Sequence, residues 1–317
     1  KKLALEMGYL PSATARGLKT RRSRALGVIV SHIDDPFWSE VLQGIEDVLH
    51  PAGYSLFVAA TRREPQREKT VVEEMVQRGV DGVILCAPQF SADPSSLLKT
   101  FGVPTAMVNN EGAEGCEYSI FNDNLYGIQL ITRHLIELGH RQIAFLGNRV
   151  GGRTTVDRER GFREELGRAG LQPREGYILM APQSTPDGGF AGAECLLALP
   201  ERPTAIMCYN DHMAIGVYSA LYRAGLRVPQ DISVTGFDDI AIAQHLIPPL
   251  GEFLLTPAGH EEVPESAEAA ALVGVADGVA LAHDLVEQRT LGAFPKRDLL
   301  AHLPVEPAEV LFHLAEV

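Results

Sequence analysis

Residues 204–237, TAIMCYNDHMAIGVYSALYRAGLRVPQDISVTGF, hold the pattern that decides the fold. An apolar run at 204–209 is followed by a stretch with helical periodicity and then by a second apolar run at 232–237. Continuous apolar strands that alternate with helices are typical of a parallel sheet covered by helices on both faces. This stretch therefore predicts an α/β fold.

The same alternation runs from residue 25 to about residue 250. The apolar runs predict strands at 26–31, 55–60, 82–87, 104–109, 118–121, 142–147, 177–181, 204–209 and 232–237. Asp35 with Pro36 can begin a helix, and Gly139 can end one that starts near Asn124. Nine strands exceed one comfortable sheet and the pattern restarts near residue 125, so we expect two doubly wound parallel-sheet lobes.

Charge is distributed unevenly along the chain. The whole sequence of 317 residues has a net charge of −13, yet residues 1–24 carry seven basic residues and one acidic residue. A basic arm on an acidic body argues against non-specific nucleic-acid binding by the body and permits binding by the arm alone. No apolar run is long enough to span a bilayer, and no apolar segment of a signal peptide follows the basic N-terminus. We therefore expect a cytoplasmic protein.

Cysteine usage agrees with a reducing compartment. The four cysteines, Cys86, Cys116, Cys195 and Cys208, are scattered without close pairs. Free cysteines of this kind are typically buried. We expect buried, reduced thiols.

Polar and aromatic residues follow the predicted strands, where ligands bind in open parallel sheets. The candidate ligand-binding residues are Asp34, Phe37, Trp38, Asn110, Arg158, Asn210, Asp211 and Asp238. Carboxylates and amides form paired hydrogen bonds with hydroxyls, and an aromatic face packs on the apolar face of a sugar ring. The set predicts a site for a small polyhydroxylated ligand.

Some of these residues have a purely structural alternative. Helix capping alone would account for Asp35, Asn210 and Asp239. Phe37 and Trp38 could be core residues of the first helix. Because they are adjacent, both cannot face inward from one helix stripe, which favours a ligand contact for at least one of them.

Signals for catalysis and metal binding are poor. The sequence has no G-x-S-x-G elbow, no Walker A loop, no G-x-G-x-x-G after the first strand, and no histidines at metal-ligand spacing. Asp34–Asp35 and Asp238–Asp239 are sequence neighbours whose side chains diverge, so neither pair forms an obvious acid/base dyad. Arg158 lies in an RER run that is usually exposed. We expect no enzyme activity, no cofactor and no metal.

Five motifs together resemble the LacI family of bacterial transcription regulators. They are GYLPSATARGLKTRRSRALGVIV (8–30), DDPFWSEVLQGIED (34–47), HLIELGHRQIAFLG (134–147), RERGFREEL (158–166) and PTAIMCYNDHMAIGVYSALYRAGLRVPQDISVTGFDDI (203–240). The resemblance runs from about residue 3 to residue 250. It implies a type I periplasmic-binding-protein fold, in which two lobes flank a ligand cleft, joined to an N-terminal helix-turn-helix headpiece.

The resemblance also implies a division of the chain. Residues 1–24 correspond to a headpiece remnant and hinge helix, 25–122 to the N-terminal lobe and 123–250 to the C-terminal lobe, while 251–317 form an atypical acidic segment. That segment does not align with the family, so we expect the third crossover and the last strand of the first lobe to be missing. With most of the headpiece absent, the chain is not expected to read a major-groove sequence.

Residues 12–19 match the family's hinge helix, which folds on operator DNA. By that match Leu18 is the wedge in the minor groove, with Ala15, Arg16 and Lys19 beside it. An apolar wedge kinks the duplex, and flanking basic residues hold phosphates. The alternative is a basic linker that is disordered without DNA.

The family's effector residues carry over by position. Asp34, Phe37 and Trp38 match its first binding loop, Arg158 its ligand-clamping arginine, Asn210 and Asp211 its ND pair, and Asp238 the first acid of GFDD. The resemblance thus implies a homodimeric repressor of operator DNA, whose effector changes lobe closure and thereby the separation of the two hinges.

Other functions stay open on the sequence. A solute-binding protein for sugar uptake would have the same fold and cleft. A sugar-modifying enzyme could use Asp238 or Asp211 as base. The effector is expected to be a pentose, hexose or glycoside, and a nucleobase is the other candidate.

Overall fold

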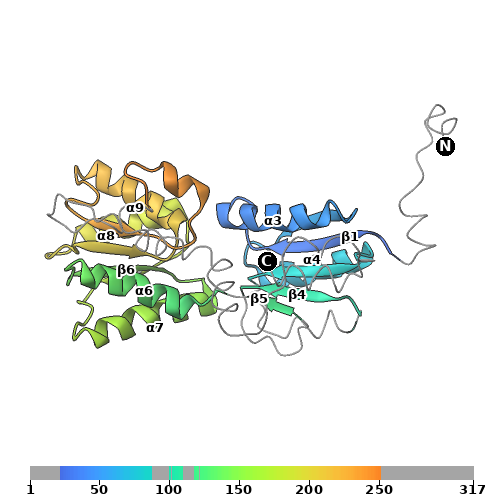
Figure 1. The fold of residues 1–317 in the computed structure, drawn as a ribbon, viewed down its shortest axis with the longest axis horizontal. Coiled ribbons are helices and arrows are strands. Elements are labelled where there is room, and N and C mark those ends of the chain that lie inside the picture. Colours follow the sequence, from blue (N-terminus) through green and yellow to red (C-terminus); the bar gives the residue numbers. More distant parts are fainter. Residues whose placement is uncertain (1–21, 88–99, 101, 110–117, 121, 251–317) are drawn as a thin grey trace, which may run out of the picture. The chain divides into compact units, whose positions relative to one another are not determined.

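The computed structural model describes residues 22–87, 100, 102–109, 118–120 and 122–250. The predicted hinge residues, Asn110, Cys116 and the segment 251–317 lie outside the described residues. The described chain falls into two compact units, of which the second begins at Asn122 (Figure 1). We call them unit 1 and unit 2 and describe each by itself.

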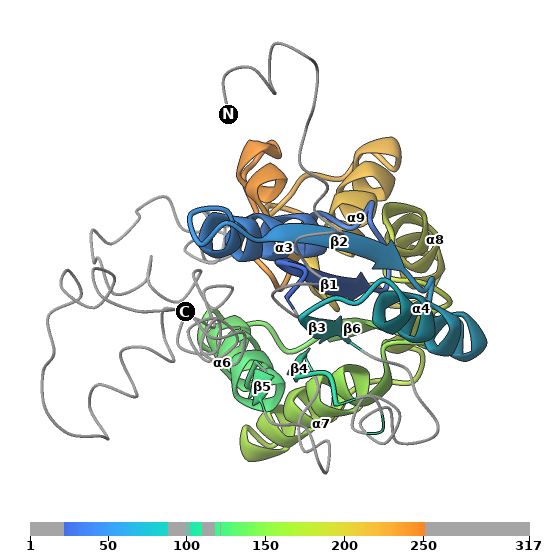
Figure 2. The same cartoon turned by 90° about the vertical axis from the view of Figure 1, so that its right-hand side faces the viewer.

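Unit 1 is a parallel sheet with helices on its two faces. Its strands, in spatial order, are β2 (Ser55–Ala60), β1 (Ala25–Val30), β3 (Gly82–Cys86), β4 (Thr105–Val108) and β5 (Tyr118–Ile120). Even-numbered residues of β1 and β3 belong to one apolar cluster with α3 (Pro36–Leu49), and odd-numbered residues to another with α4 (Pro65–Gln77). Figure 2 shows these two helices on either side of β1. Both faces of β1 are therefore buried, which explains its unbroken apolar sequence.

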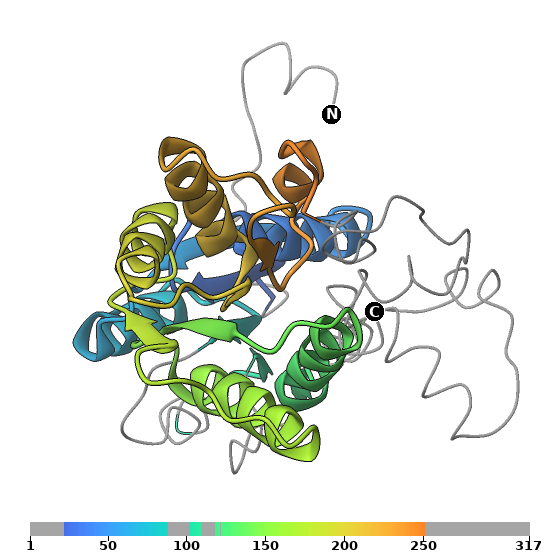
Figure 3. The same cartoon turned by 90° about the vertical axis from the view of Figure 1, so that its left-hand side faces the viewer.

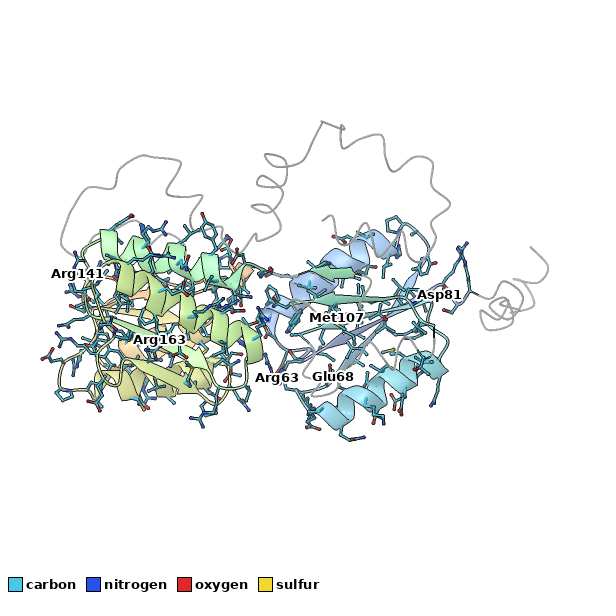
Figure 4. All side chains as sticks on the ribbon, turned by 90° about the horizontal axis from the view of Figure 1, so that it is seen from below. Arg63, Glu68, Asp81, Met107, Arg141 and Arg163 are labelled. Carbon is cyan, nitrogen blue, oxygen red and sulfur yellow. The ribbon has the colours of Figure 1, made fainter. Side chains whose placement is uncertain are left out.

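The first strand of unit 1 is held at its start by Asp81, just before β3. The Asp81 carboxylate accepts hydrogen bonds from the backbone amides of Ser23 and Arg24 at 2.8 and 3.0 Å, and from the Ser23 hydroxyl at 2.9 Å. Figure 4 shows Asp81 at this edge of the unit. The chain thus enters β1 from an anchored position.

Unit 2 is a second parallel sheet with two helices on each face. Its strands, in spatial order, are β7 (Ile178–Ala181), β6 (Ile143–Asn148), β8 (Ala205–Cys208) and β9 (Ser233–Thr235). Its helices are α6 (Asn124–Glu137), α7 (Gly152–Arg168), α8 (Pro186–Leu197) and α9 (Asp211–Arg223), with a 3₁₀ helix at Ala241–His245. The first two helices cover one face and the next two the other (Figures 1 and 3).

Close packing in unit 2 depends on small residues. Apolar side chains of α6 and α7, such as Ile128 and Phe162, form one cluster with β6 and β8. On the other face, a side chain at Gly216 of α9 would collide with the Pro186 carbonyl of α8. Glycine there lets the two helices approach backbone to backbone.

The nine predicted strands are all present, with ends shifted by at most two residues. Helix α3 begins as predicted: the Asp35 carboxylate accepts a hydrogen bond from the Phe37 amide at 3.1 Å, and Pro36 is in the first turn. Helix α6 ends two residues before Gly139, which has φ of +93°. Asp239 does not cap a helix, because the 3₁₀ helix that follows has Ile240 in that position.

The cysteine prediction is partly wrong. Cys86 and Cys208 are buried free thiols, as expected, but Cys195 on α8 is exposed. None of the described helices has both the length and the hydropathy that a membrane span requires.

Candidate functional site

Arg158 on α7 is the centre of the polar cluster in unit 2. Its side chain is 3% exposed, so the alternative of a surface arginine is wrong. Its Nε donates to Asn124 Oδ1 at 2.9 Å, Nη1 donates to the Tyr209 carbonyl, and Nη2 lies 3.7 Å from Asp238 Oδ1. Three different partners therefore hold the guanidinium fork in one orientation.

Two aromatic rings flank the same guanidinium. Arg158 Cζ lies 3.7 Å from the ring centroid of Phe237 and 4.7 Å from that of Tyr209. Cation–π attraction of this kind strengthens when water is excluded. Tyr209 follows β8 and Phe237 follows β9, so the cluster lies at the carboxyl ends of these strands, where ligands bind in open parallel sheets.

Asn210 and Asp211 have structural roles at the start of α9. Asn210 Oδ1 accepts a hydrogen bond from the Met213 amide at 3.0 Å, so this residue caps α9. Asp211 is 2% exposed, and its Oδ2 accepts from the Ile240 amide at 3.0 Å. Burial raises the pKa of Asp211 to about 6, although hydrogen bonds from backbone amides act against that shift.

The segment after β9 is held in an unusual conformation. Asp238 and Asp239 have φ of +122° and +51°, in the region that non-glycine residues rarely adopt. The Asp211 carboxylate fixes this turn by accepting the hydrogen bond from the Ile240 amide. A side chain at Gly236 would collide with the same carboxylate. Asp211 therefore helps to place Asp238 beside Arg158.

Buried polar atoms without a hydrogen-bond partner occur at the strand ends of unit 2. Among the described residues they include Asn148 Nδ2, at the end of β6, and Thr235 Oγ1, at the end of β9. The two strands flank β8. Buried polar groups normally have hydrogen-bond partners. Two such atoms without a partner at the strand ends near Arg158 therefore favour a bound polar ligand or water.

Unit 1 has the same feature at its own strand ends. Ser31 Oγ follows β1 and Asn109 Oδ1 follows β4, and both are buried without a hydrogen-bond partner in the described part of the chain. These two strands flank β3. Asn109 has φ of +61°, a strained conformation that often occurs at ligand sites.

The predicted first binding loop lies partly in the core of unit 1. Asp34 is exposed. Trp38 is 3% exposed and belongs to the apolar cluster under α3, while Phe37 is half-buried and packs against the same cluster. The two rings meet edge to face, with centroids 4.9 Å apart. Both aromatic side chains therefore help α3 to pack against the sheet.

Asn124, like Tyr209 and Phe237, was not among the candidate residues found from the sequence. Asn124 precedes Arg158 by 34 positions, at the start of another helix, and contacts it only in the folded unit. No local motif marks it. Within the described residues, no group of three or more histidine, cysteine, aspartate or glutamate side chains could hold a metal ion.

Comparison with known proteins gives a consistent result. Residues 132–259 match the periplasmic binding protein-like domain family. The ribose operon repressor of Escherichia coli K12 is 36% identical over 246 residues, which cover 77% of this chain and 74% of the repressor. The transcriptional repressor PurR of Haemophilus influenzae PittEE is 33% identical over 245 residues, covering 77% and 73%.

Solved structures agree with these relatives. A ribose operon repressor structure from Burkholderia thailandensis, described as putative, has 31% identity and a TM-score of 0.62, covering 72% of this chain and 85% of its own. A LacI family transcriptional regulator from Enterococcus faecium, solved with bound ribose, has 27% identity and a TM-score of 0.63, covering 74% and 87%.

The family match lies within unit 2, whereas the relatives and the solved structures match more of the chain than either unit contains. The shared fold is the type I periplasmic-binding-protein-like fold with two parallel sheets. Both of these curated relatives are named as repressors rather than as enzymes. On this identity and coverage, the chain belongs to the LacI family of transcription regulators.

Proposed function

We propose that this chain senses an uncharged sugar, with ribose as the first candidate, and that the sugar changes its affinity for operator DNA. The observation that carries the proposal is the pairing of buried Arg158 with the partly buried Asp238 at the carboxyl ends of β8 and β9. A guanidinium beside a carboxylate offers donors and acceptors together, which suits neighbouring hydroxyls of one sugar ring.

The charges favour a neutral ligand over an anionic one. Asp238 lies 3.7 Å from the only cationic side chain of the cluster described above, and the carboxyl of Asp211 is buried nearby. The positive charge of Arg158 is already balanced by Asp238, so a phosphate or carboxylate ligand would be repelled by these acidic side chains. Relatives named for ribose, or solved with ribose bound, support a pentose.

The proposed DNA contacts are those of the hinge. Leu18 enters the minor groove, and Ala15, Arg16 and Lys19 lie beside it, as the family resemblance implies. A DNA-binding regulator of this kind acts in the cytoplasm. Its effector-binding residues in unit 1 are proposed to be Asp34, Phe37, Trp38 and Asn110, and in unit 2 Arg158, Asn210, Asp211 and Asp238.

We further propose a homodimer. Among the described strands, β2 lies at one edge of the unit 1 sheet, and its Phe57 and Val58 are exposed apolar side chains. In unit 2, Tyr222 and Ile247 are 85% and 93% exposed. Exposed apolar groups on an unpaired edge strand favour association, so a second copy of the chain would cover them.

Calorimetric titration of the chain with ribose, glucose, sucrose and a purine base tests the effector class. Saturable one-to-one binding of ribose supports the proposal, and binding of the purine base alone would contradict it. Sedimentation equilibrium of the same protein tests the dimer, which F57D should dissociate. Selection from a random DNA duplex pool, with and without ribose, then tests whether the sugar changes DNA affinity.

A further inference from the structure

The side chain of Asn124 joins two parts of unit 2. Its Oδ1 accepts the hydrogen bond from Arg158 Nε at 2.9 Å. Its Nδ2 donates to the carbonyl of Asn122 at 3.1 Å, and its backbone amide donates to the same carbonyl at 2.8 Å. One rigid, planar amide therefore connects the arginine with the residue at which the chain enters unit 2.

Asn124 is not needed to begin its helix. The N-cap of α6 is Asp123, whose carboxylate accepts a hydrogen bond from the Tyr126 amide at 2.9 Å. Asn124 is the first residue of α6, directly after that cap, so the helix start does not require its side chain. Yet Asn124 is buried and both polar atoms of its amide are used. This use favours a role directed at Arg158.

We propose that Asn124 is a positioning residue for the effector site, and this inference rests on the proposed function of Arg158. It holds the guanidinium in the orientation in which the effector meets Nη1 and Nη2, and it ties that orientation to Asn122. A shift of the Arg158 side chain on effector binding is thereby transmitted to Asn122, where the chain enters unit 2. Asn124 does not itself contact the effector.

The geometry explains why an oxygen is required at this position. Arg158 has Tyr209 and Asp238 as partners for its two terminal nitrogens, whereas Asn124 is the partner of Nε. Without an acceptor there, the buried Nε–H would lose its hydrogen bond and the fork could rotate about its last side-chain bond. Rotation would misalign both terminal nitrogens at once.

The test compares N124A, N124D and D123A with the wild type. N124A removes both amide atoms. N124D keeps an oxygen for Arg158 but replaces the donor to Asn122 with an acceptor. D123A removes the cap of the same helix and leaves Asn124 intact, so it controls for a loosened helix start.

Ribose affinity by calorimetry is the first readout. We expect N124A to weaken binding by about tenfold or more, N124D to remain within about threefold of the wild type, and D123A to bind like the wild type while melting at a lower temperature. Equal binding by N124A and wild type would overturn the inference. Equal losses in N124A and D123A would also overturn it, because they would indicate general loosening.

A second readout needs no ligand. The Nε proton of Arg158, followed in nitrogen-15 NMR spectra, should exchange slowly with water in wild type, N124D and D123A, and rapidly in N124A. If wild type binds no ribose, the proposed effector is wrong, but this exchange pattern still decides the role of Asn124. Unchanged slow exchange in N124A would refute it.

A third readout addresses the tie to Asn122. Ribose should slow hydrogen exchange of the backbone amides of residues 122–126 in the wild type and leave it unchanged in N124D. Equal slowing in both proteins would show that Asn124 does not connect Arg158 with the chain entry.

Discussion

The carboxylate of Asp211 and the backbone amide of Ile240 are joined by a hydrogen bond of 3.0 Å, which fastens the start of α9 to the turn after β9. The same turn carries Asp238, the partner of Arg158, in a left-handed conformation. A residue that the sequence suggested as a ligand contact thus acts in the structure as support for a neighbouring one.

The stability contributed by Asp211 should decrease as pH rises. Its pKa in the folded state is about 6, above its ordinary value of 3.8, so the folded chain binds this proton more tightly than the unfolded chain does. The difference in unfolding free energy between wild type and D211N should shift against the wild type by about 2–3 kcal/mol between pH 4 and pH 6.5. Urea unfolding of both proteins measures it, and a pH-independent difference would refute the assigned shift.

His140 should produce the opposite dependence. Its ring nitrogens lie 2.9 Å from the Thr204 hydroxyl and 3.1 Å from the Ser233 hydroxyl, and burial lowers its pKa below 6.5. As pH falls through 6.5, the unfolded state takes up a proton that the folded state refuses, so stability is lost toward acid pH. Urea unfolding of wild type and H140Q from pH 7.5 to 5 should show a steeper loss in the wild type.

Replacing Arg158 by lysine should separate charge from geometry. R158K keeps the positive charge, but a single ammonium cannot reach Asn124, the Tyr209 carbonyl and Asp238 together. We expect the variant to lose ribose affinity by about tenfold to a hundredfold, as measured by calorimetry. A circular dichroism spectrum like that of the wild type would serve as the folding control, and undiminished binding would exclude Arg158 from the effector site.

Gly236 and Gly44 form a matched pair of substitutions. A side chain at Gly236 would meet the Asp211 carboxylate and Leu250, whereas one at Gly44 of α3 has open space around it. G236A should therefore destabilise the fold by about 1–3 kcal/mol, and G44A should stabilise it by about 0.5–1 kcal/mol. Thermal unfolding of both variants checks the signs, and a neutral G236A would show that the turn after β9 can relax.

Sequence periodicity was sufficient to locate the strands because they are buried on both faces. Every β1 residue is buried, with alternate side chains under α3 and α4, so the strand reads as an unbroken apolar run. The spatial order of strands was not readable in the same way. Strand β3 lies beside β1, and β8 lies beside β6, although β2 and β7 come between them in the chain. This order depends on how each strand–helix–strand connection crosses the sheet, which periodicity along the chain does not show.

The search for polar residues that follow predicted strands identified Arg158 and Asp238, but it could not assign the roles of the residues beside them. Asn210 had a local alternative as a helix cap, and the hydrogen bond to Met213 shows that it has this role. Because Phe37 and Trp38 are adjacent, the sequence favoured a ligand contact for at least one of them. In the structure both side chains pack against one apolar cluster, and their rings meet edge to face.

The sequence by itself determined the α/β class, the nine strands, the start of α3 and α6, and the strand ends that carry polar residues. Each of these follows from neighbours in the chain, through side-chain periodicity and capping. Only the tertiary structure decided that Asn124 holds Arg158 and that Asp211 supports the turn of Asp238. These contacts join residues 34 and 29 positions apart, and no local pattern encodes them because they exist only when α6, α7, α9 and the strands between them have packed.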